Sequence, residues 1–414
     1  MAASYGSWMK IYFVAFLVST CAFAAEDWPR WRGPNADGGW NPQDLPADFA
    51  TKEPERLWKQ EISAGFGGVT ASSGRVYVMD HLKTPKEVER ILCFDAESGR
   101  NVWEHSWEVS YGSMEYGTGP RSSVNITSGR AYALGATGVA SCLNAVTGQV
   151  LWQVDTVKTF GAKVPKWGFA ASPVIDGDRV LLHVGANAGS VIALDKNSGK
   201  EVWRGGPDPA GYSTPEIITH AGTRQLIAWG PEHVQSLNPV SGLVNWLFPY
   251  NITYGVSIAQ PLYHDGILLV SGYWHGAKAL QLGTSPELLW ENKNEICGLM
   301  SAPLFKDGIV YMLDKTRGVQ AFELKTGKIL WSDDSSLTPK DSNPQMSLVW
   351  LQESTNLAAL LNASGELVYV TLKPEKREEL ARWQIIGKTW AHPAFAGNRV
   401  FARSDKELSA WRLW

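Results

Sequence analysis

Short apolar runs separated by glycine turns follow one another along almost the whole chain. Each unit has an apolar run, a turn with glycine, a second apolar run, and an apolar segment around alanine or cysteine that leads to a Ser/Thr-Gly turn and a tryptophan. Amphipathic helices would place apolar residues at three-to-four spacing, which these units lack. The pattern therefore predicts an all-β chain of many short strands joined by hairpins.

Glycine marks the first hairpin of almost every unit, because it readily adopts the positive φ angles that tight hairpins need. These turns are Ser73-Gly74, Ser128-Gly129, Asp176-Gly177, Ala221-Gly222, Asp265-Gly266, Asp307-Gly308 and Ala396-Gly397. Only the seventh unit, around Ser354 and Thr355, lacks such a turn. Aspartate before glycine is favoured in turns for backbone reasons, so we do not assign catalytic roles to these aspartates.

A recurring phrase closes the units, each time with a tryptophan. It reads DAESGRNVW at 95–103, NAVTGQVLW at 144–152 and DKNSGKEVW at 195–203, and it returns more loosely elsewhere. We predict that its tryptophans are structural wedges between neighbouring repeats: Trp58, Trp103, Trp152, Trp203, Trp246, Trp290, Trp331 and Trp383. Their spacing, from 41 residues (290 to 331) to 52 (331 to 383), is typical of propeller blades with four strands each.

The two ends of the chain complete one blade. Residues 390–413 contain three predicted strands of an eighth unit, and residues 56–60, with Trp58, supply the fourth. Such pairing closes the ring and leaves no free sheet edge where the termini meet. We therefore predict an eight-bladed β-propeller over residues 55–414, with four antiparallel strands per blade and the last blade closed by the N-terminal strand.

Residues 1–25 have the features of a secretory signal peptide. Lys10 precedes an apolar stretch at 11–18, and small residues lead to the acidic Glu26. We expect export to the periplasm or cell envelope, without a transmembrane segment in the mature chain. Residues 18–21 resemble a bacterial lipoprotein box, but Thr20 before Cys21 fits that box poorly, so we do not expect a lipid anchor.

Residues 26–54 form an arm that is rich in tryptophan and proline. Trp28, Trp31 and Trp40 stand among five prolines. Proline removes backbone hydrogen-bond donors, so the arm is expected to be extended, and its three indoles are too apolar to leave in water. We expect the arm to pack across one face of the propeller. A partner-docking arm and a lid over the channel are the alternatives.

Charge and cysteine content narrow the function further. The chain has 38 Lys and Arg against 41 Asp and Glu, a net charge of −3, so no nucleic-acid partner is expected. Without Cys21, three cysteines remain, and neither they nor the scattered histidines have the spacing of a metal site. Cys93 and Cys142 occupy a position that holds small residues in other units. We expect them to fill space there, with a disulfide between them as the alternative.

The repeated phrase, approximately A-x-D-x-x-T-G-x-x-x-W, resembles the tryptophan-docking repeat of the pyrroloquinoline quinone (PQQ) propeller superfamily. The resemblance covers nearly all of residues 55–414, and residues 27–38, DWPRWRGPNADG, are similar to the leader of PQQ-like propellers from planctomycete-type bacteria. It implies an eight-bladed fold and one of two branches. These are quinoprotein alcohol dehydrogenases and non-catalytic proteins of the BamB-like kind.

The dehydrogenase branch implies an adjacent cysteine pair, a Glu and an Asn that hold Ca²⁺ against PQQ, and an Asp as base. The chain has no such pair, and none of the three roles falls on a matching motif. We therefore predict an exported, non-catalytic, monomeric scaffold that mediates protein binding or assembly in the envelope, without a resident cofactor or metal. The alternatives are a PQQ- and Ca²⁺-dependent oxidoreductase of alcohols or sugars, and a carbohydrate-binding propeller.

The loops that enter the innermost strands are aromatic and polar, which indicates a candidate site at one mouth of the channel. We expect it to bind an envelope protein or a small, flat or polar ligand. Aromatic packing between blades is the alternative. The predicted ligand-binding residues are Phe66, Glu115, Tyr116, Arg121, Lys166, Trp167, Tyr212, Tyr254, Gln345, Trp390 and His392.

Overall fold

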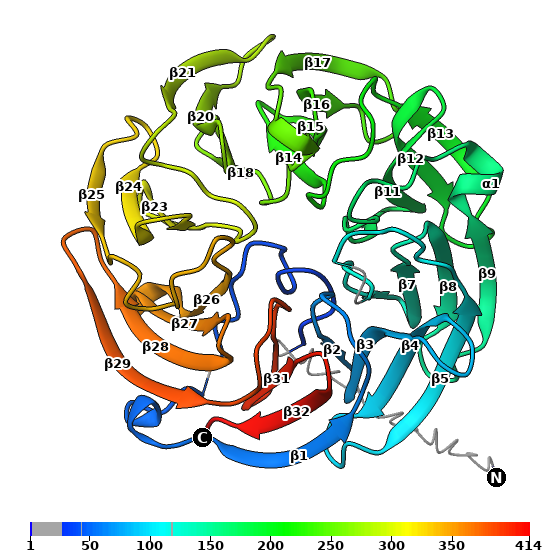
Figure 1. The fold of residues 1–414 in the computed structure, drawn as a ribbon, viewed down its shortest axis with the longest axis horizontal. Coiled ribbons are helices and arrows are strands. Elements are labelled where there is room, and N and C mark those ends of the chain that lie inside the picture. The colour runs from blue at the N-terminus through cyan, green and yellow to red at the C-terminus, as the bar shows by residue number, and fades with distance from the viewer. Residues whose placement is uncertain (2–26, 43, 117–118) are drawn as a thin grey trace.

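Eight sheets of four antiparallel strands surround a central channel in the computed structural model (Figure 1). The structure describes residues 27–42, 44–116 and 119–414, together with Met1. The predicted signal peptide and the lipoprotein-like stretch at 18–21 therefore lie outside the described residues, apart from Met1 itself. The eight-bladed all-β fold is as the sequence predicts, and every blade has the expected number of strands.

Each blade runs from a short inner strand at the channel to an outer strand at the rim. Blades 1 to 4 are β2 (Thr70–Ser72), β3 (Arg75–Leu82), β4 (Val88–Asp95), β5 (Asn101–Glu108); β6 (Asn125–Thr127), β7 (Arg130–Leu134), β8 (Val139–Asn144), β9 (Val150–Asp155); β10 (Val174–Asp176), β11 (Arg179–Ala186), β12 (Gly189–Asp195), β13 (Glu201–Gly205); β14 (Glu216–His220), β15 (Thr223–Trp229), β16 (His233–Leu237), β17 (Val244–Pro249).

The remaining blades repeat this order, and the last one contains both ends of the ring. They are β18 (Leu262–His264), β19 (Ile267–Gly272), β20 (Gly276–Gln281), β21 (Glu287–Asn292); β22 (Leu304–Lys306), β23 (Ile309–Asp314), β24 (Gly318–Glu323), β25 (Ile329–Ser332); β26 (Met346–Gln352), β27 (Leu357–Asn362), β28 (Glu366–Leu372), β29 (Arg377–Gln384); β30 (Ala394–Ala396), β31 (Arg399–Arg403), β32 (Glu407–Arg412), β1 (Glu55–Glu61).

The closure of the ring follows the predicted register. Strand β1 pairs antiparallel with β32, and Trp58 lies opposite Ala410. The N-terminal strand therefore completes the C-terminal blade, as Figure 1 shows at the lower edge of the ring. Buried side chains of both strands join one core cluster, in which Trp58 packs with Phe401 and Leu408. The two ends of the propeller are thus interdependent.

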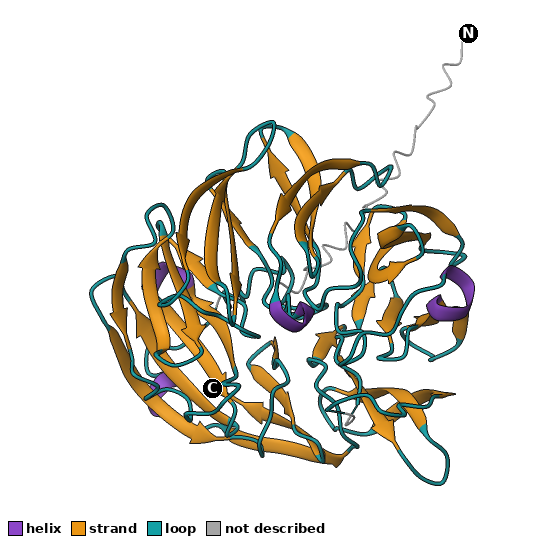
Figure 2. Cartoon of the chain, turned by 45° about the horizontal axis from the view of Figure 1, so that its top comes forward, coloured by secondary structure: helices purple, strands orange, loops and turns teal. Residues whose placement is uncertain are grey.

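Among the residues that the structure describes, helical structure is confined to short turns, as Figure 2 shows. The helices are η1 (Phe49–Thr51), α1 (Thr156–Phe160), η2 (Thr253–Gly255) and η3 (Glu353–Thr355). Helix η3 occupies the hairpin where the seventh unit lacks its glycine. Asn356 follows it with a φ of 63°, in the left-handed region of the backbone. Asparagine is among the few residues besides glycine that tolerate this region.

The repeat tryptophans pack on the phrase of the following blade. The indole of Trp103 lies against Gly148, where a Cβ atom would stand 2.7 Å from the ring, and its Nε1 donates to the carbonyl of Ala145 at 3.1 Å. Trp58, Trp152 and Trp290 meet the next glycine and donate to a backbone carbonyl in the same way. Glycine is therefore needed in the phrase both for its turn and for the indole above it.

Four tryptophans depart from this arrangement. Trp203 packs on Gly242, but its Nε1 has no hydrogen-bond partner among the described residues. Of the other three, Trp331 keeps a bond to a backbone carbonyl of the next blade, at Lys373. Trp246 instead donates to Gln225, and Trp383 packs on Tyr369, each within its own blade. The departures do not follow the quality of the phrase alone, because Trp203 closes a close copy and Trp290, which closes a looser one, keeps the standard contact.

Cys93 and Cys142 are free and fully buried. They lie on the third strands of blades 1 and 2, directly opposite Trp103 and Trp152 in the strand register. Each thiol fills the small space beside a repeat tryptophan. The two cysteines do not form the alternative disulfide.

The N-terminal arm crosses one end of the channel. Asp27 accepts hydrogen bonds from Ser72 and Ser73 at the C-terminal end of β2. The loop that enters β2 lies at the other end of the strand. The arm then spans the ring, shown as the blue segment at the centre of Figure 1. The backbone of Trp40 pairs with Trp350 in β26. One end of the channel is thereby covered by the chain itself.

Buried side chains hold the arm in place. Trp28 is 1% exposed and packs with Phe395 and the ring of His392. Arg32 is 2% exposed and donates to the carbonyl of Pro303, in the loop that enters β22. The arm therefore adds its own apolar and polar contacts to the inner surface of several blades.

A candidate binding cavity at the channel mouth

A cavity of about 380 Å³ opens at the end of the channel where the loops enter the inner strands. This volume falls in the range of small-ligand sites. The loops before all eight inner strands, β2, β6, β10, β14, β18, β22, β26 and β30, contribute to its wall. Nine of the predicted site residues line it: Phe66, Tyr116, Arg121, Lys166, Trp167, Tyr212, Tyr254, Gln345 and Trp390.

The other two predicted residues do not line this cavity. Glu115 stands beside it, and its carboxylate pairs with Lys166 at 3.0 Å. His392 is 6% exposed and lies beneath the N-terminal arm, where its ring contacts Trp28 and Trp31. Burial lowers the pKa of His392 to about 4, so the imidazole is neutral at pH 7. His392 therefore packs against the arm and does not line the cavity at the mouth.

Aromatic rings make up two parts of the cavity wall. On one side, Trp390 packs with Phe66 at a centroid distance of 5.5 Å and with Tyr116 at 5.9 Å. On another, Trp167 packs with Tyr212 at 5.8 Å. These tilted pairs leave ring faces and edges available to a ligand. The predicted aromatic rim is therefore assembled from loops that are far apart in the sequence.

Two rim tyrosines adopt an unusual backbone conformation. Tyr116 has a φ of 51° and is 52% exposed, while Tyr254 has a φ of 59° and is 66% exposed. Bulky residues rarely occupy this region, because the Cβ atom crowds the backbone. Such residues cluster at binding sites, where the surrounding structure holds them. Both backbones hold an aromatic ring in solvent at the mouth of the cavity.

Two cationic groups stand among these rings. The guanidinium of Arg121 lies 5.5 Å from the centroid of Phe66 and donates to the carbonyl of Tyr116 at 2.6 Å. The Nζ of Lys166 lies 5.2 Å from the ring of Trp167 and 5.7 Å from that of Tyr254. Burial lowers the pKa of Arg121, but an arginine remains charged at neutral pH. The mouth therefore combines aromatic faces with positive charge.

The sequence did not identify two important parts of the wall. Trp31 of the arm lines the cavity, and its Nε1 donates to Gln260 at 2.9 Å. Trp274 lines the opposite end beside Tyr254, at a centroid distance of 5.3 Å, and is 44% exposed. A comparison of hairpins would have found Trp274, because its turn reads Tyr-Trp-His where the next blade has Lys-Thr-Arg. No local signal marks Trp31, whose position depends on the path of the arm.

The cavity does not suit a calcium-bound quinone. None of the described residues that line it carries a carboxylate, and the side-chain oxygens available are the amides of Asn343 and Gln345 and a few hydroxyl groups. Calcium prefers a shell of several oxygens, usually including Asp or Glu. Arg121 and Lys166 would also repel a divalent cation. The residues present therefore do not fit the Ca²⁺–PQQ centre that the dehydrogenase branch implies.

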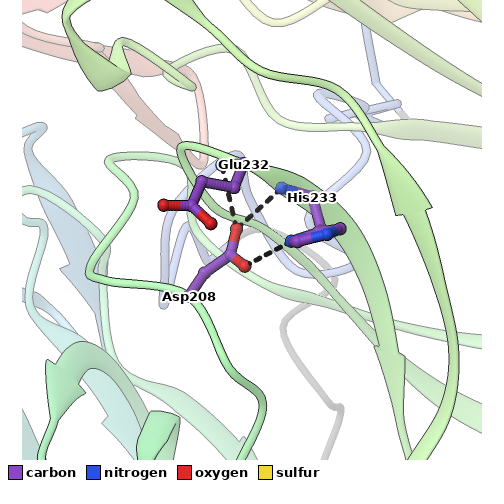
Figure 3. A group of neighbouring side chains, drawn as sticks. All are labelled: Asp208, Glu232 and His233. Carbon is purple, nitrogen blue, oxygen red and sulfur yellow. Dashed lines mark hydrogen bonds and ion pairs between the residues drawn. The ribbon is translucent and has the colours of Figure 1, made fainter.

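A separate cluster of Asp208, Glu232 and His233 has the composition of a metal site, but its hydrogen bonds explain it (Figure 3). One oxygen of Asp208 accepts hydrogen bonds from the backbone N–H groups of Glu232, at 3.0 Å, and His233, at 2.7 Å. The other lies 2.7 Å from Nδ1 of His233. The buried carboxylate thus fixes the hairpin between β15 and β16.

Comparisons with known proteins agree with this fold. BamB of Yersinia pestis is 22% identical over 311 residues, which cover 71% of this chain and 74% of that protein. The crystal structure of BamB from Moraxella catarrhalis matches with a TM-score of 0.59 and 16% identity, over 86% of this chain and 98% of that one. Quinohemoprotein alcohol dehydrogenase from Comamonas testosteroni matches with a TM-score of 0.70 and 14% identity, over 95% and 81%. Likeness to solved structures at these identities establishes the shared fold alone.

Family membership rests on a longer match. The model of a family described as "Outer membrane protein assembly factor BamB" matches residues 87–250 and 230–413, which together are most of the propeller. Within the described part of the chain, no helix is long and apolar enough to cross a membrane. Because the family model matches more than half of the chain, the chain belongs to the family of the outer membrane protein assembly factor BamB.

Proposed function

We propose that the protein is an exported, non-catalytic scaffold that binds a protein partner in the periplasm or cell envelope through the mouth of its channel. The predicted signal peptide supports export, and the relatives are named as assembly factors of outer membrane proteins. The observation that carries the proposal is the cavity itself: it is walled by aromatic rings, and the described lining residues offer no carboxylate for calcium.

The exposed part of the cavity is suited to a protein surface. Tyr116, Tyr254 and Trp274 are each about half exposed or more, and they stand around one opening. Large aromatic side chains are enriched in the centres of protein interfaces, where they bury much area at a small cost in conformational entropy. Trp31 lies at the other end, so a partner approaches from the side of these rings.

Site-specific photo-cross-linking tests this function. A benzophenone amino acid is placed at Tyr254 and, as the matched control, at Leu243, which is 70% exposed in the turn before β17. We expect irradiation of living cells to join the Tyr254 variant to a defined envelope protein that the Leu243 variant does not capture. Equal products at both positions, or no product at Tyr254, would contradict the proposal.

A titration with PQQ tests the oxidoreductase alternative separately. A ligand that binds only the native state raises the melting temperature. We expect no calcium-dependent increase in the melting temperature of the purified protein, because the described cavity wall has no carboxylate ligand. A saturable increase that requires both PQQ and Ca²⁺ would favour the dehydrogenase function instead.

A further inference from the structure

We infer that the cavity selects a partner segment in which an aromatic side chain stands next to carboxylate groups. The inference rests on the proposed function, because it names the chemistry of the partner at the same mouth. It follows from three features of the cavity: the charge of its wall, the exposed ion pair at its edge, and its closed inner end.

The first feature is charge complementarity. Arg121 and Lys166 line the cavity, and no described lining residue carries a negative charge. Arg121 contacts the ring of Phe66 and backbone carbonyls, and it is attracted by the buried Glu89 behind the wall, but it makes no direct ion pair among the described residues. A partner that brings carboxylates to this wall supplies the missing charge, whereas a basic segment is repelled.

The second feature is the ion pair between Lys166 and Glu115. Both side chains are 51% exposed and lie 3.0 Å apart, so the pair is a surface salt bridge of small net value. Lys166 also lies over Trp167 and Tyr254, the rings that a ligand would contact. When the cavity is free, the carboxylate of Glu115 is therefore paired with the ammonium group of Lys166. An incoming carboxylate competes with Glu115 for the same ammonium group.

The third feature is the shape of the cavity. The aromatic walls form a pocket that the arm closes with Trp31, which is held by its hydrogen bond to Gln260. A pocket closed at its inner end accepts a side chain from one direction and does not let a chain thread through. Its aromatic lining suits an aromatic side chain, and the cations near Tyr254 and Phe66 suit carboxylates that flank that side chain.

Calorimetry with synthetic pentapeptides tests the inference. The probes are an acetylated and amidated Gly-Asp-Trp-Asp-Gly, the same peptide with Asn in place of Asp, and the same peptide with Ala in place of Trp. We expect the first peptide to bind at least about tenfold more tightly than the other two, and its advantage to shrink in high salt. Equal affinity for the Asp and Asn peptides, or no binding of the first peptide, would overturn the inference.

Three variants separate charge from folding. Lys166→Gln is expected to weaken binding of the acidic peptide about threefold, while Glu115→Gln is expected to strengthen it about threefold, because the competing carboxylate is gone. Lys325→Gln, at an exposed position in the turn between β24 and β25, is the control and should change nothing. A gain of affinity cannot come from misfolding. Unchanged or weaker binding by Glu115→Gln would therefore overturn the inference.

Two further outcomes identify which proposal fails. Cross-links at Tyr254 in cells, together with peptides that bind without regard to charge, would leave the scaffold function standing and remove the acidic selectivity. Indole-3-acetate provides the same chemistry without a polypeptide. If it binds more tightly than the acidic peptide, the site takes a small aromatic carboxylate, and the inference of a partner segment is wrong.

Discussion

Tryptophans in the blades and tryptophans at the mouth illustrate two uses of the same side chain. Trp103 is 8% exposed and lies on a glycine of the next blade, with its N–H group bonded to Ala145. Trp274 is 44% exposed and packs with the rings of Tyr254 and Tyr273 at a hairpin tip. What a tryptophan does here thus depends on its neighbour: a glycine of the next repeat gives it a structural role, and an open cavity gives it a surface role.

The largest expected effect is that of Trp103→Ala. Loss of a nearly buried indole removes its packing on Gly148 and its hydrogen bond, so we expect the free energy of unfolding to fall by about 3–5 kcal/mol. Trp274→Ala is the matched control, with an expected change below about 0.5 kcal/mol. Denaturant unfolding of both variants checks this. Similar losses would mean that the mouth tryptophan is structural too.

Two glycines with almost the same backbone angle isolate the contact from the turn. Gly148 has a φ of 74° and lies under Trp103, whereas Gly129 has a φ of 73° and open space, with no neighbouring atoms within 4 Å of where a Cβ would stand. Gly129→Ala should cost about 1 kcal/mol for the backbone alone. Gly148→Ala should cost about 2–3 kcal/mol, because the new methyl group also displaces the indole. Equal costs in thermal unfolding would contradict the docking role of the glycine.

The covered end of the channel, beneath the cavity, has a carboxyl group near an arginine, whereas the described wall of the mouth has cations and no carboxylate. Burial raises the pKa of Glu216, at the start of β14, to about 7, and the nearby Arg32 opposes this increase. Between pH 4.5 and 7 the native state therefore binds more protons than the unfolded state, so this carboxyl lowers stability as the pH rises through that window. Glu216→Gln should raise the melting temperature by a few degrees at about pH 8 and by little at about pH 4.5. A constant difference across this range would contradict the raised pKa of Glu216.

The smallest expected effect concerns the strained tyrosine at the mouth. Tyr254→Gly relieves the positive φ angle and should stabilise the protein by up to about 1 kcal/mol, less the entropy cost of glycine. The same change removes an exposed ring from the cavity, so the affinity for the acidic peptide should fall. Thermal unfolding and peptide titration of this variant check both parts. Destabilisation would show that the ring has a packing role instead.

The sequence predicted the ring well because its information is local and repeated. The phrase around Gly99, Gly148 and Gly199 recurs with its tryptophan, so eight copies support one conclusion, and the missing strand at Trp58 indicates how the ring closes. The loops before the inner strands also share one position in every blade. For that reason most of the predicted rim residues meet at one cavity.

The rest depends on contacts between distant segments. Trp31 reaches the cavity only because the arm crosses the channel and bonds to Gln260, 229 positions away. His392 was predicted at the mouth from its loop, but the stacked Trp28 of the same arm covers it. Pairing of Glu115 with Lys166 likewise joins two blades. No repeat pattern specifies these contacts, since each occurs once.

The most direct test of the division between ring and mouth is a pair of measurements on Trp274→Ala. Its unfolding midpoint and its affinity for the acidic aromatic peptide are compared with those of the unchanged protein. We predict the same midpoint and an affinity at least about fivefold lower, because an exposed ring at the mouth contributes to binding and little to stability. A lower midpoint with unchanged affinity would contradict this division of roles.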